Sequence, residues 1–294
     1  LFRHLAYTGF FKKKSFKTIA MLSENHSLGR AIFDSAKKCG IRTIGIQHGG
    51  IAAISYDYRF SIEDMKYKPV PDYSIVWGDH WKENLIKYGN YSEGQIKVLG
   101  QIRTDIIPKL NLGEKARNKK RKFEIVFASQ TFSQDIGRER AASDVFQAVR
   151  DLENVVLTIK PHPNEKDDLF FTLLAEKYGC KNYKIERKTD LYILLARCHA
   201  LVTRYSWVGA EAVYFKKPLI TLDYDKDDVQ NFKKEGVAFQ VFDSEGLKKN
   251  IEALVNKELE IPYEKYESFI QKYAFNIDGC VSTRIINFIK SLCI

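Results

Sequence analysis

Residues 155–165, Val155-Val156-Leu157-Thr158-Ile159-Lys160-Pro161-His162-Pro163-Asn164-Glu165, decide the fold class of this chain. The first six are mostly apolar and β-branched, which is typical of a strand buried on both faces of a sheet. Pro161 and Pro163 end this strand and fix the backbone on either side of His162. A helix-length segment, 168–178, comes next. The stretch therefore predicts one strand–loop–helix unit of a parallel α/β sheet.

The same alternation of strands and helices continues on both sides of this unit. Strands are predicted at 16–23, 42–47, 72–77 and 96–99 in a first block, and at 124–128, 155–160, 183–185, 200–203 and 218–222 in a second. Helices are predicted at 27–38, 82–88, 139–152, 168–178, 190–196, 208–214, 244–255 and 281–292. Because this order forms parallel sheets covered on both faces, the fold class is α/β with two Rossmann-like, doubly wound domains. Such domains in tandem are expected to face a cleft at the carboxyl ends of their strands.

Composition shifts divide the chain into three parts. Residues 1–107 form an N-terminal Rossmann-like domain, 108–122 a polar and basic linker, and 123–294 a C-terminal Rossmann-like domain. The last predicted helix is expected to pack back on the first domain. The first domain is short, since the strands expected upstream of Thr18 are missing from it, so we expect it to be truncated.

The net charge of +10, from 47 Lys+Arg against 37 Asp+Glu, is confined to two short runs. Four of the charges lie between positions 12 and 17, and six lie between positions 115 and 122; the remainder of the chain is neutral. The basic residues concerned are Lys12, Lys13, Lys14 and Lys17, and then Lys115, Arg117, Lys119, Lys120, Arg121 and Lys122. Charge runs are usually solvated, and no aromatic platform accompanies these, so we expect no nucleic-acid partner. Peripheral contact with an anionic membrane is the expectation that the runs favour.

Composition and cysteine usage describe an ordinary water-soluble protein. The chain of 294 residues is 45% hydrophobic and 29% charged, which excludes disordered and collagenous classes. No apolar stretch is long enough to cross a bilayer. The five cysteines are widely spaced and include no CxxC pair, so we expect reduced thiols and a cytoplasmic location, with the inner face of the cell membrane as the candidate site of contact.

Polar and ionisable residues follow the carboxyl end of most predicted strands, where ligands of open α/β sheets bind. Neither GxGxxG nor GxxxxGK[ST] occurs, so the dinucleotide and P-loop fingerprints are absent. The residues at the strand ends are His48-Gly49-Gly50, Ser129-Gln130-Thr131, Pro161-His162-Pro163, Arg204-Tyr205-Ser206 and Asp223-Tyr224-Asp225.

His162 is the most specific of these candidates because two prolines hold its backbone. Together with the Lys160 cation, it would stabilise the charge of a phosphate leaving group without a metal. The alternative is a histidine that caps a turn.

Two further strand ends offer groups for a nucleotide. Ser206 precedes a predicted helix, where it either caps the helix or shares its amides with a phosphate. Glu211, one turn on, is a candidate acceptor for ribose hydroxyls, or a solvated carboxylate. Ser129, Gln130 and Thr131 offer hydroxyl and amide groups, or form a polar turn.

His48 is the candidate general base of the first domain. Gly49 and Gly50 allow close backbone approach, and a neutral imidazole at a cleft edge accepts the proton of a hydroxyl nucleophile. The alternative is a buried structural histidine. Glu24 and His26, after the first strand, are rival candidates.

Six motifs occur in a fixed order along the chain. They are His48-Gly49-Gly50, the V-x-G-x-x-R-x-D segment from Val98 to Asp105, Lys160-Pro161-His162-Pro163, the T-x-Y-S-x-x-x-x-E-A segment from Thr203 to Ala212, Lys216-Lys217-Pro218-Leu219-Ile220, and the D-G-x-x-S-x-R segment from Asp278 to Arg284. In this order they resemble glycosyltransferases of the B fold, and the resemblance covers about Thr18 to the end. Within that fold the chain is similar to the bacterial surface-polysaccharide group: capsule polysaccharide transferases, sialyltransferases with an HP motif, and CDP-glycerol glycerophosphotransferases.

The resemblance implies a metal-independent transferase with no cofactor, moving a sugar or polyol phosphate from a CMP-, CDP- or UDP-activated donor to a surface or lipid-linked glycan. It implies that 1–107 is the acceptor side and 123–294 the donor side. His48 would be the acceptor-side base and His162 would hold the donor's phosphates, with Glu24 kept as a catalytic candidate. The implied donor-binding residues are Ser129, Gln130, Thr131, Lys160, Pro163, Arg204, Ser206 and Glu211. The chain departs from the group at Gln47, where tryptophan is usual.

Two other functions fit parts of the sequence. A nucleotide-sugar 2-epimerase would share the fold, but its Gly-rich signature is replaced here by Tyr205-Ser206-Trp207-Val208-Gly209. A non-catalytic module that binds anionic ligands through the basic runs is the third possibility.

Overall fold

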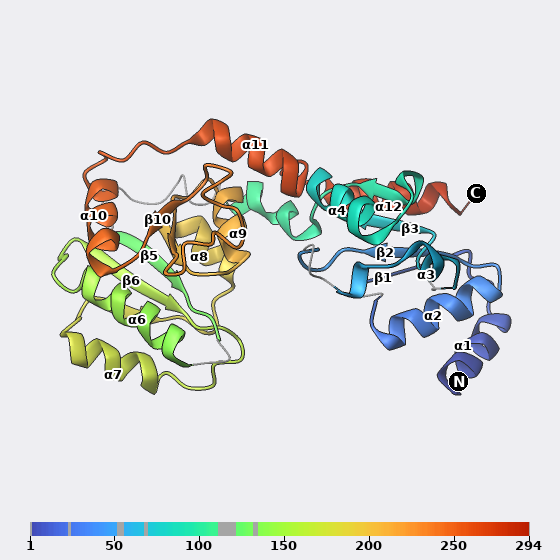
Figure 1. Cartoon of the computed structure of the whole chain (residues 1–294), viewed down its shortest axis with the longest axis horizontal. Coiled ribbons are helices and arrows are strands. Elements are labelled where there is room, and N and C mark those ends of the chain that lie inside the picture. The colour runs from blue at the N-terminus through green and yellow to red at the C-terminus, as the bar shows by residue number, and fades with distance from the viewer. Residues whose placement is uncertain are drawn as a thin grey trace. The chain divides into compact units, whose positions relative to one another are not determined.

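The structure is a computed structural model that describes residues 2–22, 25–51, 56–67, 70–110, 122–131 and 135–293. It divides into two compact units, and each is described by itself (Figure 1). Unit 1 combines residues 1–106 with 270–294, and unit 2 comprises residues 107–269. Helix α11 (Tyr263–Ala274) runs across the boundary at its C-terminal end.

Unit 1 is built on a parallel four-stranded sheet whose order, β1-β2-β3-β4, follows the chain. Ile44 of β2 and Ile75 of β3 pack against Val281 and Ile285 of the last helix, α12, and all four side chains are buried. The elements are α1 (Phe2–Lys12), β1 (Thr18–Leu22), α2 (Ser27–Lys38), β2 (Arg42–Ile46), α3 (Ile62–Tyr67), β3 (Tyr73–Val76), α4 (Asp79–Gly89), β4 (Ile96–Val98) and α12 (Val281–Ser291), with short 3₁₀ turns at Tyr56–Tyr58, Glu93–Gln95 and Ile102–Ile106.

Two of the motifs singled out in the sequence meet in unit 1 and join the C-terminal segment to the sheet. The Asp105 carboxylate accepts the backbone N–H groups of Val281, at 2.7 Å, and Ser282, at 2.8 Å, at the start of α12. Arg284 Nε donates to the Leu99 carbonyl at 3.0 Å. Gly100 has φ +102°, and a Cβ there would lie 2.9 Å from Val281 Cγ2, so no other residue fits. The Val98–Asp105 and Asp278–Arg284 segments are therefore structural partners.

The C-terminal residues of helix α11 pack against the start of α4 in this unit. The fully buried Trp81 donates its indole N–H to the Tyr273 carbonyl at 2.8 Å, and a Cβ on Gly78 would overlap the Lys272 carbonyl. The backbones of α4 and α11 thus approach so closely that only glycine fits at position 78.

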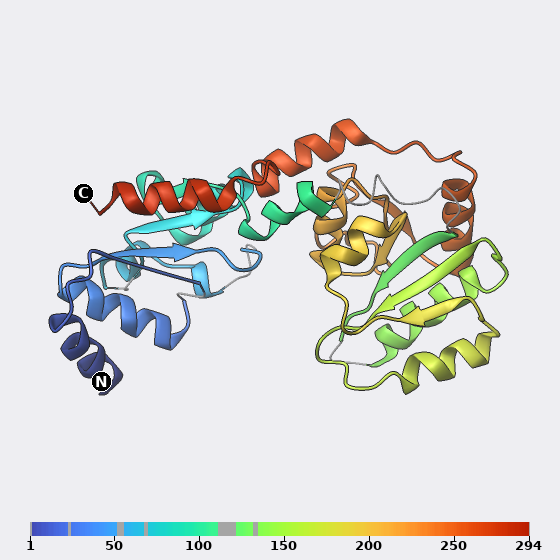
Figure 2. The same cartoon turned by 180° about the vertical axis from the view of Figure 1, so that it is seen from behind.

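Unit 2 contains a parallel six-stranded sheet of order β10-β9-β8-β5-β6-β7. Helices α6, α7 and α10 lie on one face and α8 and α9 on the other, as the two opposite views show (Figures 1 and 2). The elements are β5 (Phe123–Ala128), α6 (Asp135–Val149), β6 (Val155–Lys160), α7 (Leu169–Tyr178), β7 (Tyr183–Ile185), α8 (Leu191–Arg197), β8 (Ala200–Thr203), α9 (Val208–Tyr214), β9 (Leu219–Leu222), β10 (Phe239–Val241) and α10 (Ser244–Val255).

The order of these strands makes unit 2 doubly wound. From β5 the chain moves outward through β6 and β7, then returns to place β8 on the other side of β5. Fully buried apolar side chains fill both layers, as expected of a parallel sheet covered on two faces. The α/β fold class predicted from the sequence is confirmed.

The sequence predicts one domain over 123–294, whereas the structure groups residues 270–294 with unit 1, because Trp81 and Asp105 bind that segment. The expected return of the last helix is one part of this larger segment. The predicted linker 108–122 lies mostly outside the described residues, and 107–110 are helical.

The labelled elements α1, α3, α11 and β10 have no counterpart among the predicted helices and strands. Helix α11 carried a usable signal, since Tyr266, Phe269, Ile270 and Tyr273 recur at i, i+3, i+4 and i+7 and are all buried. Strand β10 has only three residues.

Asp105→Ala should loosen α12, because two N–H groups in its first turn lose a charged acceptor. We expect the free energy of unfolding of unit 1 to fall by about 1–2 kcal/mol. Amide hydrogen exchange at Val281 and Ser282 should accelerate. The matched control is Asp57→Ala, an exposed aspartate of the same unit. Equal exchange at α12 in both variants would contradict this role of Asp105.

Candidate functional site

The candidate site of unit 2 lies where the strand order reverses, at the carboxyl ends of β5 and β8. Open α/β sheets bind ligands at such a switch point, since the loops from the two strands diverge there. Ser129 and Gln130 follow β5, His162 follows the adjacent β6, and Arg204 follows β8. Four residues proposed from the sequence therefore lie on three neighbouring strands.

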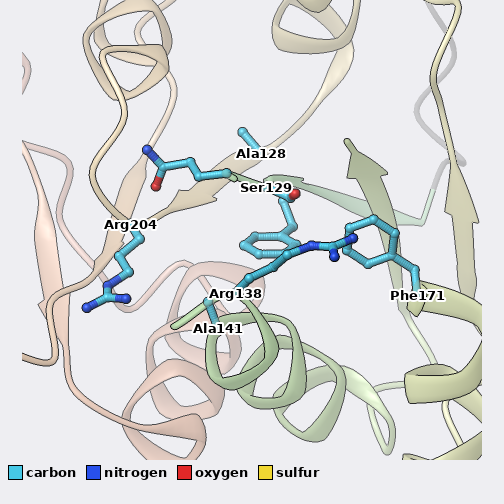
Figure 3. A pocket seen from close by; sticks show the side chains of 8 residues that line it. Ala128, Ser129, Arg138, Ala141, Phe171 and Arg204 are labelled. Carbon is cyan, nitrogen blue, oxygen red and sulfur yellow. The ribbon is translucent and has the colours of Figure 1, made fainter. Parts of the chain in front are cut away.

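A small recess opens between these loops (Figure 3). It is shallow, with a cavity volume of about 10 Å³, which is room for about one water molecule. Arg138 of α6 and Arg204 lie on either side of it, and the Arg138 guanidinium extends toward the Phe171 ring. The lining residues are Phe127, Ala128, Ser129, Gln130, Arg138, Ala141, Phe171 and Arg204.

Gln130 connects the two strand ends across the switch point. Its Oε1 accepts the backbone N–H of Tyr205 at 2.7 Å. This bond fixes the side-chain amide and leaves its NH₂ group as the polar end that a ligand can meet.

Arg204 is held in place by rings and a carboxylate. Its side chain is 12% exposed, and its Nη2 donates to Asp225 Oδ2 at 2.8 Å. The guanidinium carbon lies 4.5 Å from the Tyr205 ring centre and 5.0 Å from that of Tyr224. A planar cation fixed in this way is suited to bind a phosphate.

The hydroxyl of Tyr205 also bonds to Asp225. Burial and this hydrogen bond raise the pKa of Tyr205 to about 12, so the phenol stays neutral at physiological pH. The same bond, with Arg204 beside it, lowers the pKa of Asp225. Asp225 is thus an ionised carboxylate shared by a phenol and a guanidinium.

His162 is half-buried, and its ring is oriented by its own loop. Its Nδ1 accepts the backbone N–H of Asn164 at 3.2 Å. Pro163, next to it, is exposed.

Lys160 is used by the fold to a greater extent than predicted. Its Nζ donates to the carbonyls of Arg187, at 2.7 Å, and Thr189, at 2.8 Å, and burial lowers its pKa. An ammonium group has three protons, and two of them bond the end of β6 to the segment before α8. The predicted contact with a phosphate would therefore use the third proton.

The other predicted donor-site residues occupy more ordinary positions. Ser206 Oγ accepts the Val208 N–H at 3.2 Å, while the N-cap position of α9 is Trp207. Glu211 is partly exposed on α9, and Thr131 is exposed and lines a second recess with Arg138 and Asn164. Their roles toward a nucleotide stay predictions.

In unit 1, His48 is exposed, so the buried structural alternative is wrong. Its neighbour Gln47 is buried and holds the loop in place. Gln47 Oε1 accepts the Trp77 N–H at 2.9 Å, its Nε2 donates to Gly49 O at 2.8 Å, and its own carbonyl accepts the Trp77 indole N–H at 3.0 Å. Asn84 Nδ2 donates to Ile51 O at 2.7 Å. The loop that carries His48 is therefore fixed on both sides.

The two rival candidates have different outcomes. Glu24 lies outside the described residues. His26 is exposed and forms the N-cap of α2 without a side-chain capping bond.

Arg138 is absent from the residues predicted for the site, because helix α6 begins at Asp135, four residues before the predicted start. Asp225 is among the strand-end residues and Glu165 follows His162-Pro163-Asn164, but the sequence assigns neither of them a role. Nothing in the spacing of Glu165 indicates that it is buried. Among the described residues no group of three His, Cys, Asp or Glu residues is arranged to hold a metal, and metal-independent transfer stays a prediction. No helix in the same part of the chain is long and apolar enough to cross a membrane.

Asp225→Asn should lower the pKa of Tyr205 from about 12 toward its ordinary value of 10, because a neutral amide no longer disfavours the phenolate. ¹³C NMR of labelled tyrosine, assigned with Tyr205→Phe, measures this titration. Asp151→Asn, at an exposed aspartate of the same unit, is the control. A Tyr205 pKa that does not change would show that Asp225 has no influence on the phenol.

Several solved structures share the fold of this chain. A UDP-N-acetylglucosamine 2-epimerase from Listeria monocytogenes superposes with a TM-score of 0.68 at 15% identity, covering 98% of this chain and 78% of the other. The wall teichoic acid polymerase TagF, as a histidine-to-asparagine variant soaked with CDPG, gives a TM-score of 0.61 at 15% identity, covering 99% and 84%. The corresponding epimerase from Neisseria meningitidis, bound to UDP-GlcNAc, gives 0.63 at 11% identity, covering 98% and 80%. No curated protein sequence matches the chain.

The sequence comparison is more specific. Residues 44–291 match the family described as CDP-glycerol:poly(glycerophosphate) glycerophosphotransferase, which spans both units and contains His48, His162 and the switch-point recess. The resemblance stated from the motifs is thereby confirmed, with the glycosyltransferase-B architecture. This chain belongs to the CDP-glycerol glycerophosphotransferase family and is a nucleotide-dependent transferase.

Proposed function

We propose that the chain transfers glycerol phosphate, or a closely related polyol phosphate, from a cytidine-diphosphate-activated donor to a surface glycan or polyol-phosphate acceptor. The observation that carries the proposal is the placement of Gln130, His162 and the fixed Arg204 at the carboxyl ends of β5, β6 and β8, inside the segment that matches the family. The TagF structure soaked with CDPG supports the choice of cytidine.

The chemistry is a substitution at phosphorus. The acceptor hydroxyl forms a new P–O bond to the donor's β-phosphorus, the anhydride bond breaks, and CMP leaves with the bridging oxygen. In this proposal Arg204 and His162 stabilise the phosphate charge that develops on CMP. The acceptor's proton passes to His48, whose exposed imidazole is held on a fixed loop.

In this proposal the remaining polar groups of unit 2 bind the nucleoside of the nucleotide substrate. The free NH₂ group of Gln130 is suited to donate to the donor, and Thr131, Ser206 and Glu211 are the further candidates. Pro163 and Lys160 keep the His162 loop in its conformation.

Contact with a membrane is part of the same proposal. Lys12, Lys13, Lys14 and Lys17 are all exposed beside α1, where Phe2 is 88% and Leu5 58% exposed. Lysines near an anionic leaflet contribute about 1 kcal/mol each. Such contact would place the enzyme at the inner face of the membrane, near a lipid-linked acceptor. The second basic run lies almost entirely outside the described residues.

A nucleotide panel tests the donor. CMP and CDP should raise the thermal midpoint by several degrees at hundredfold excess over Kd, because binding then adds about 2.7 kcal/mol to the folded state. UDP and GDP should give smaller shifts. Arg204→Gln should remove the CDP shift while Arg150→Gln, at an exposed arginine of the same unit, keeps it. A larger shift with UDP than with CDP would overturn the cytidine assignment.

Histidine variants test the chemistry. With CDP-glycerol as donor and CMP release as the readout, His162→Ala should lower kcat by about 10²–10³-fold. His48→Ala should lower kcat by about 10²–10⁴-fold.

His26→Ala distinguishes the rival base, and it should leave kcat unchanged. Full activity in His162→Ala with an intact fold would refute the donor-site assignment, and loss in His26→Ala alone would transfer the base role to His26.

The second candidate function is 2-epimerisation of a nucleotide sugar, which the epimerase neighbours favour at the level of the fold. Conversion of UDP-N-acetylglucosamine with no acceptor present would support it over transfer.

A further inference from the structure

Glu165 is a buried carboxylate in the loop between β6 and α7. Its side chain is 2% exposed, although the loop lies at the carboxyl end of the sheet. A carboxylate removed from water in this way is costly unless donors surround it.

The donors to Glu165 come from three separate elements. Oε2 accepts the Ser129 hydroxyl, from the end of β5, and the His162 backbone N–H at 2.6 Å. Oε1 accepts Arg138 Nε of α6 at 2.6 Å. The Arg138 guanidinium in turn stacks 3.7 Å from the Phe170 ring centre on α7.

The loop is also fixed from its outer side. Arg187 donates to the carbonyls of Glu165 and Asp167 and to the Asp168 carboxylate. The Glu165 N–H donates to the His162 carbonyl at 2.9 Å, which closes a tight turn around Pro163. His162 is therefore held at its own N–H and its own carbonyl by a single residue.

These bonds settle which protons face a ligand. Ser129 has one hydroxyl proton and gives it to Glu165, so toward a nucleotide its oxygen only accepts. The Asn164 N–H donates to His162 Nδ1, so the neutral imidazole carries its proton on Nε2.

We propose that Glu165 is a positioning residue for the phosphate chemistry. It fixes the His162 backbone so that the neutral imidazole directs its Nε2–H toward the phosphate of the nucleotide substrate and forms a hydrogen bond with it. This inference rests on the function proposed above. It changes the expected roles of two residues, since His162 acts as a hydrogen-bond donor and Ser129 as an acceptor.

Glu165→Gln is the sharpest variant because it keeps the volume. Its single amide oxygen cannot replace both carboxylate oxygens, so an NH₂ group must face either Arg138 or the His162 N–H. We expect kcat for CDP-glycerol to fall about tenfold to hundredfold, as for a small misplacement of a reacting group, with the donor KM changed by much less. Glu176→Gln, at an exposed glutamate of α7, is the matched control and should keep the wild-type kcat.

¹⁵N NMR of labelled histidine gives a readout that does not depend on activity. In the wild type, His162, assigned with His162→Ala, should show a protonated Nε2 and an unprotonated Nδ1; in Glu165→Gln the two tautomers should mix. Wild-type kcat or an unchanged tautomer in Glu165→Gln would overturn the proposal. If that variant does not fold, a wild-type His162 protonated on Nδ1 would still overturn it. A protein inactive on CDP-glycerol that shows the expected tautomers refutes the proposed function but not the positioning.

Discussion

The parallel pairing of β5 with β8 is the constraint on which the candidate site depends. Ile125, Val126 and Phe127 pair with Ala200, Leu201 and Val202. Because these strands are adjacent in space but far apart in sequence, their loops leave the sheet in different directions and open a recess between them. The Gln130–Tyr205 bond spans that recess. Without the reversal of strand order, the same polar residues would cap a closed sheet edge.

Unit 1 depends on a different constraint, which is the return of the chain end. Trp81 and Asp105 bind backbone groups of residues 273–282, and Gly78 and Gly100 provide the close approach. The motifs that indicated the family in this region are therefore packing motifs. Gly100, Asp105 and Arg284 in these segments hold the last helix on the sheet.

Periodicity predicted most of the fold because the strands of unit 2 are buried on both faces and end at clear breakers. The segments 155–160, 183–185 and 200–203 were predicted with the bounds that the structure has. His162 and Arg204 could be predicted as site residues because each follows the carboxyl end of a predicted strand. This criterion did not reveal Glu165, because a glutamate after His-Pro-Asn reads as solvated, and only the burial created by Arg138 and Ser129 makes it a buried acceptor. Long-range pairs of this kind have no local signature.

The local charges of unit 2 explain why the net charge of the chain says so little about its chemistry. Each cation near the switch point already has an internal partner: Arg138 has Glu165, Arg204 has Asp225, and Lys160 has two carbonyls. An anion that takes the Nη2 donor of Arg204 exchanges with Asp225. That exchange is feasible because the guanidinium side chain is 12% exposed and fixed between rings, whereas the Asp225 side chain is 60% exposed and can move into water. A phosphate that takes the place of Asp225 supplies negative charge to Arg204, so the guanidinium stays paired. A binding site of this kind works through the geometry of a few paired cations.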